Sequence, residues 1–91
     1  MIDAAYDRHA DVLYIARGRP RPDYGEEGEE GIIWRFAEAD DAPCGVTVLG
    51  FRESWTGREG LPVGKVGAFL RADAAQVAQA VEAAVSREAA V

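Results

Sequence analysis

Two carboxylates and an imidazole alternate near the start of the chain, at Asp7, His9 and Asp11. Divalent metal ions accept these ligand types, so the three residues are candidates for a metal site or a metal-dependent enzyme. The competing interpretation is a hairpin turn in which the aspartates accept hydrogen bonds from backbone amides and His9 faces solvent. The turn is favoured, because alternating residues around a turn need not converge and no fourth ligand is evident.

Other patterns in the chain approach catalytic or nucleotide-binding motifs without completing them. The single cysteine, Cys44, could join His9 and an aspartate in a thiol-hydrolase set, but a lone cysteine beside a strand is more often a small buried hydrophobe. Residues 60–66 approach a phosphate-binding loop, yet the glycine spacing is one residue short and Val66 replaces the hydroxyl that would hold magnesium. We therefore predict no catalytic residue, no metal, no cofactor and no enzymatic activity.

The basic cluster of the sequence consists of Arg17, Arg19 and Arg21. It could contact nucleic acid, which makes a nucleic-acid-contacting regulator an alternative function. Exposed charge on a proline-rich loop is normally only solvated, and a net charge of -6 repels phosphate backbones. We expect nucleic acid to be a poor partner and the acidic run at 26–30 to favour a basic protein.

Composition indicates one small folded domain, spanning 1–91. Hydrophobic residues make up 48% of the chain and charged residues 29%, which is enough apolar material for a core. One cysteine cannot form an internal disulfide, which fits a reducing compartment. Residues 1–7 lack the features of a signal peptide, and no apolar run reaches the roughly 18 residues of a membrane span. We expect a cytoplasmic location and no membrane contact.

The apolar patterns predict strands followed by a helix. A tight polar turn opens onto the most continuous β-branched and aliphatic run of the first half of the chain, which is typical of a hairpin entering a buried strand. We expect strands at 2–6, 12–16, 32–37 and 45–51, a turn at 38–43, and a long connection or a frayed edge strand at 18–31. Residues 61–70 fit a strand and a helix equally. Asp73 and Gln76 form a capping-box-like start to a C-terminal helix at 73–88.

These elements predict an α+β fold, with a small antiparallel β-meander of three to four strands within 1–51 and the C-terminal helix packed on one face. One slender, alanine-rich helix cannot cover both apolar faces of such a sheet. The uncovered face would carry Trp34 and Phe36 or Leu49 and Phe51, which we take as candidate interface residues. Such a face predicts a homodimer or a protein partner.

Three short motifs resemble a family of small bacterial proteins, the domain-of-unknown-function family 2283. The motifs are Tyr6-Asp7 followed by Ala10-Asp11 and Leu13-Tyr14-Ile15, then Gly31-Ile32-Ile33, then Gly45-Val46-Thr47-Val48-Leu49. The resemblance covers roughly residues 6–51, and residues 52–91 have no counterpart in it. It implies a compact β-rich fold and no assigned activity, so it transfers no functional residue to this chain.

The sequence therefore predicts a small non-enzymatic protein-protein interaction or regulatory module that forms a homodimer. Small acidic bacterial proteins often neutralise a toxin, and by that analogy an antitoxin-like role with a basic partner is one form of this function.

Overall fold

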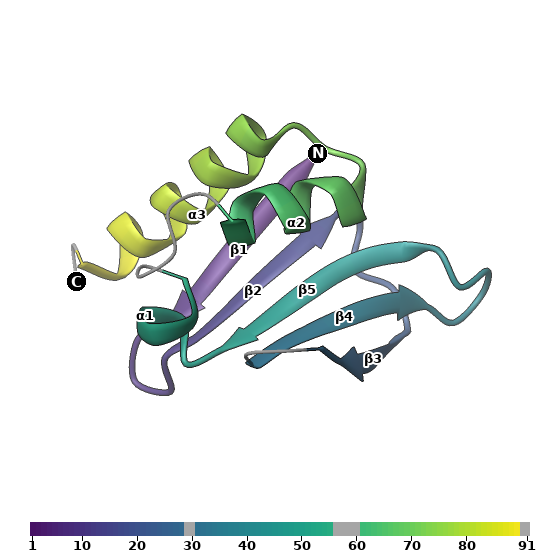
Figure 1. Ribbon diagram of the computed structural model, residues 1–91, viewed down its shortest axis with the longest axis horizontal. Helices are drawn as coiled ribbons and strands as arrows, with labels where there is room; N and C mark the ends of the chain where they lie inside the picture. The colour runs from purple at the N-terminus through teal and green to yellow at the C-terminus, as the bar shows by residue number, and fades with distance from the viewer. Residues whose placement is uncertain (29–30, 56–60, 90–91) are drawn as a thin grey trace.

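Five strands form one antiparallel sheet in the computed structural model, which describes residues 1–28, 31–55 and 61–89 (Figure 1). The strands are β1 (Ile2–Asp7), β2 (Val12–Arg17), β3 (Asp23–Glu27), β4 (Ile32–Ala37) and β5 (Pro43–Leu49). Their order across the sheet is β1-β2-β5-β4-β3. The predicted α+β class with an antiparallel sheet is confirmed, but three to four strands was an undercount. The predicted meander is also wrong, because β5 lies between β2 and β4 and β2 does not pair with β3.

The connection from β2 to β3 crosses the end of the sheet. The two strands are consecutive in sequence but β5 and β4 lie between them, so residues 18–22 span three strand spacings, about 14 Å. Pro20 and Pro22 suit this crossing because it forms no ladder. Residues 23–27 then form the edge strand β3, so the stretch we predicted as a connection or an edge strand contains both.

Three helices follow the sheet: α1 (Phe51–Ser54), α2 (Leu61–Leu70) and α3 (Ala74–Ala89). The ambiguous segment 61–70 is thus helical. At the start of α3 the Asp73 backbone N–H donates to Gln76 Oε1 at 3.3 Å, which confirms the Gln76 half of the predicted capping box. No helix in the described ranges is both long and apolar enough to cross a membrane.

The core lies between one face of the sheet and the helices α2 and α3, which lie together on one side of it (Figure 1). Alternation along each strand sends every second side chain to this face, and the register aligns Leu13 with Val48 and Ile15 with Val46. Opposite them α2 contributes Val66 and Leu70, and α3 contributes a buried stripe of Val77, Val81 and Ala84.

The structure corrects the positions of the candidate interface residues. Trp34 and Phe36 lie on the helix side, with ring centroids 4.8 and 5.4 Å from that of Phe69 in α2. Phe51 is 6% exposed and belongs to the core. Trp34 and Phe36 are partly covered within the chain because α2 adds a second covering helix. Phe51 packs against Tyr6, with ring centroids 5.0 Å apart. Leu49, at 42% exposure, is the member of the set that lies on the other face.

Candidate functional site

In the β1–β2 turn, Asp7 and Asp11 accept hydrogen bonds that stabilise the turn and the strands beside it. Asp7 Oδ1 accepts the backbone N–H groups of His9 at 3.0 Å and Ala10 at 3.1 Å, as predicted for a turn. Asp11 adopts a left-handed conformation with φ of 57°, and its Oδ1 accepts the Tyr6 hydroxyl at 2.6 Å. The described part of the chain contains no group of three or more His, Cys, Asp or Glu residues that could hold a metal ion.

Asp11 also ties the hairpin to the segment that follows β5. Its backbone carbonyl accepts the Phe51 N–H at 3.0 Å, and its carboxylate accepts the Arg52 N–H at 3.2 and 3.3 Å. These partners lie about forty residues along the chain from Asp11, so no local pattern predicts the contact. The bonds fix the start of α1 at the end of the sheet, where Phe51 closes the core.

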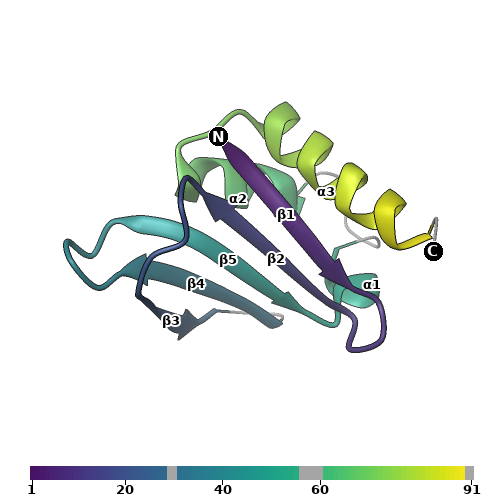
Figure 2. The same cartoon turned by 180° about the vertical axis from the view of Figure 1, so that it is seen from behind.

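No helix of the described residues lies over the second face of the sheet, here called the open face. Figure 2 shows the molecule from behind, with β1 and β2 in front of α2. The register aligns Tyr14, Thr47 and Ile33 across three strands, and Val12 with Leu49 beside them. Tyr14 is 50% exposed and Leu49 42% exposed, whereas Thr47 in the middle strand is buried. We call these five residues the open-face patch.

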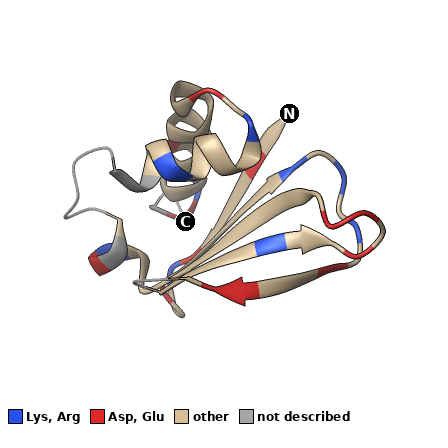
Figure 3. Ribbon diagram, turned by 45° about the vertical axis from the view of Figure 1, so that its right-hand side comes forward, with Lys and Arg blue, Asp and Glu red and all other residues tan. Residues whose placement is uncertain are grey.

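A polar cluster lies at one end of the open face. Arg35 of β4 donates to Asp23 Oδ1 of β3 through Nη2 at 2.7 Å and Nε at 3.0 Å. The Cys44 thiol lies 3.9 Å from the second oxygen, Oδ2. Figure 3 shows the positions of the charged residues, including the basic segment of β4 next to β3. The pairing of β4 with β5 shifts beyond Arg35, which leaves Cys44 as the extra residue of a β-bulge and brings it into the cluster.

The cluster keeps the Cys44 thiol protonated. Burial raises the pKa of Cys44, and the negative charge of Asp23 raises this pKa further, against the opposing effect of Arg21 and Arg35. A protonated thiol is a poor nucleophile. His9 does not join it, because His9 lies in the turn at the Leu49 end of β5 whereas Cys44 is near the beginning of that strand. The thiol-hydrolase combination is therefore not assembled.

The predicted basic cluster is brought together only in part. The Arg21 side chain folds back on its own loop, where Nη2 donates to the Arg17 carbonyl at 2.7 Å and Nε to the Arg19 carbonyl at 3.3 Å. Arg19 and Arg21 line a cavity of about 410 Å³ at the end of the open face, which Arg35 also lines. The sequence analysis missed Arg35, because a single arginine within a predicted strand is indistinguishable from an ordinary exposed residue.

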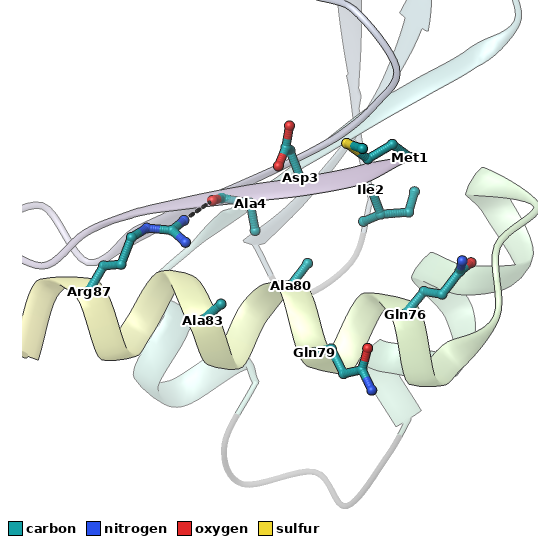
Figure 4. A pocket seen from close by; sticks show the side chains of 9 residues that line it. All are labelled: Met1, Ile2, Asp3, Ala4, Gln76, Gln79, Ala80, Ala83 and Arg87. Atoms are coloured by element: carbon teal, nitrogen blue, oxygen red, sulfur yellow. Dashed lines mark hydrogen bonds between the residues drawn. The ribbon is translucent and has the colours of Figure 1, made fainter.

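A second cavity, of about 530 Å³, lies between β1 and α3 (Figure 4). Arg87 crosses it, and its Nη2 donates to the Ala4 carbonyl at 2.8 Å. The backbone groups of Ala4 point away from β2, because the bond from Gly18 N–H to the Met1 carbonyl makes the odd-numbered residues of β1 the hydrogen-bonded ones. Arg87, a basic residue in the last turn of α3 where it suits the helix dipole, thus also covers the free edge of the sheet.

Comparisons of the chain with protein-family models, with curated proteins and with solved structures find no match. The resemblance to the domain-of-unknown-function family 2283 therefore stays a prediction, which these comparisons neither support nor contradict.

Proposed function

We propose that the protein is a small non-enzymatic interaction module that forms a homodimer through the open face of its sheet. The observation that supports this most is the pair of large exposed side chains, Tyr14 at 50% and Leu49 at 42%, on a face without a helix. The largest exposed apolar patch on a small protein is often a binding surface. A second copy of the chain presents the same patch, as a two-fold interface requires.

The size of the open face limits the strength of this association. Five strands about 4.8 Å apart and about 20 Å long give a flat area of roughly 500 Å², below the roughly 800 Å² that each partner buries in a standard interface. Self-association should therefore be reversible and of about micromolar strength. The net charge of -6 favours a basic protein as any further partner, as an antitoxin-like role would need.

The test is the oligomeric state of the purified chain. Sedimentation velocity between about 1 µM and about 1 mM should show a monomer–dimer equilibrium. Leu49→Asp places a charge in the patch and should weaken dimerisation by at least about tenfold, because a buried unpaired charge is costly. The matched control is Gln79→Asp, which adds the same charge at an exposed position of α3.

Each result of this experiment has a definite meaning. A wild-type chain that remains a monomer across the whole range overturns the proposal. A dimer that Gln79→Asp weakens as much as Leu49→Asp assigns the effect to net charge and also overturns it. A melting curve for each variant shows whether it has kept the native fold.

A further inference from the structure

We infer that the cavity at the end of the open face is a binding site for a small oxyanion, that is, a phosphate or a carboxylate group. Arg19 and Arg21 come from the connection between β2 and β3, and Arg35 comes from β4. All three line one space of about 410 Å³, large enough for a small anion with its remaining hydration shell. The cavity is formed within a single chain, so the inference does not need the proposed dimer, although Tyr14 and Thr47 belong to both the cavity and the open-face patch.

The charge in the cavity is unbalanced. Three arginines line it together with one acidic residue, Asp23. Asp23 already uses Oδ1 for Arg35 and faces the Cys44 thiol with Oδ2. The rest of the chain is acidic, so this local excess of positive charge runs against the net charge of -6. Gathering like charges is unfavourable unless a counter-charge joins them, and an anion supplies that counter-charge.

Two of the three arginines, Arg21 and Arg35, are held in place before a ligand arrives. Arg21 is fixed by two main-chain carbonyls of its own loop, at 2.7 and 3.3 Å. Gly18, with φ of 76°, makes room for it, since a Cβ there would lie 3.1 Å from Arg21 Nη2. Arg35 is fixed by its two bonds to Asp23. A guanidinium group that is already ordered loses little entropy on binding an anion.

The remaining lining favours an oxygen-rich anion. Tyr14 and Thr47 of the open face also line the cavity. Both residues carry hydroxyl groups, which are able to donate to phosphate or carboxylate oxygens. The planar donor fork of arginine matches both groups, which is why the shared chemistry is an oxyanion. The protonated Cys44 thiol adds no competing negative charge.

The experiment is a titration of the full chain with inorganic phosphate, followed by the arginine side-chain resonances in NMR spectra. Ionic strength is kept constant with sodium chloride. Phosphate should shift the Arg21 and Arg35 Nε–H signals along a saturable curve, with a dissociation constant on the order of 1 mM. A parallel titration with acetate separates the two sources, because a site for phosphate groups prefers phosphate and a site for carboxylates binds acetate as well.

Matched variants make the test specific to the cavity. Arg21→Gln should weaken binding by about tenfold, because it removes one charge-assisted contact. Arg8→Gln is the control, since it makes the same change of charge in the β1–β2 turn, at the other end of the hairpin. Arg19→Gln provides a second cavity variant if Arg21→Gln disturbs the loop.

Two outcomes overturn the inference: a shift that chloride alone reproduces without saturation, and an equal loss of binding in Arg8→Gln and Arg21→Gln. Saturable binding lost only in the cavity variants supports it. The same titration in Leu49→Asp separates this site from the proposed dimer. Leu49 does not line the cavity, so binding should persist there whether or not the chain dimerises.

Discussion

The two faces of the sheet are formed by alternating residues of the same strands, yet their side chains differ in kind. On the helix side, Leu13, Val46 and Val48 are almost completely buried and aliphatic. On the open face, Tyr14 and Leu49 remain exposed, and the Arg35–Asp23 pair lies at one end. One face is thus a dry core, whereas the other combines apolar patches with polar groups that still contact water.

This difference separates the stability of the protein from its recognition of other molecules. Burial of aliphatic side chains against α2 and α3 supplies the main driving force for folding. The open face contributes less to folding, because its large side chains stay partly wet. Substitutions there can therefore change binding while the fold persists, which makes the contrast between the faces testable at neighbouring positions of one strand.

The largest expected effect comes from Leu13→Ala on the helix side. Leu13 is fully buried, so its truncation leaves a cavity and should lower the free energy of unfolding by about 3 kcal/mol. Its neighbour Tyr14 points to the open face, and Tyr14→Thr should change the free energy of unfolding by less than about 1 kcal/mol. Urea denaturation measures both, and equal losses would contradict the division into a core face and a binding face.

The next largest loss of stability should come from Asp11→Ala, at the end of the sheet where Asp11 bonds to the start of α1. Alanine is strained at a φ of 57°, and it loses the bonds to Tyr6 and Arg52. We expect a loss of about 2 kcal/mol in the free energy of unfolding. Asp11→Gly separates the two causes, because glycine tolerates this φ but also lacks the carboxylate, so it should recover about half of the loss.

The elements of the helix side could be predicted where their signals were local. The hairpin follows from Asp7 and the apolar run after it, and α3 follows from the spacing of Val77 and Val81. β3 escaped a firm prediction because Asp-Tyr-Gly-Glu-Glu lacks a β-branched residue, and an edge strand needs little apolar surface. The pairing of β5 with β2 is set by tertiary packing, and no local sequence pattern predicts it.

The candidate site on the open face was harder to predict, because it joins distant segments. Asp23 meets Arg35 twelve residues later and Cys44 twenty-one residues later. The bulge that brings Cys44 to this face depends on the pairing of β4 with β5, which residue types do not reveal. Only the loop arginines were evident as a cluster in the sequence. Arg35 lines the same cavity but lies in β4, apart from them in the sequence.

A smaller effect should appear at alkaline pH, and it originates on the open face. Burial and Asp23 raise the pKa of Cys44 in the folded chain. Between the unfolded thiol pKa of about 8.5 and the higher folded value, the unfolded state therefore binds fewer protons, so stability is full below this window and falls as pH rises through it. Stability measured from pH 8 upward should fall less in Cys44→Ala than in the wild type, and parallel curves would contradict the assignment.

The smallest effect on stability should come from Asp23→Asn. The side chains of Arg35 and Asp23 are 32% and 26% exposed, so loss of their ion pair should lower the free energy of unfolding by less than about 1 kcal/mol. The same change removes a negative charge that raises the pKa of Cys44, so this pKa should fall part of the way, with burial still acting on the thiol. The Cβ chemical shift of Cys44, followed against pH, measures it. An unchanged pKa together with a large loss of stability would mean that this cluster supports the core and does not serve the open face.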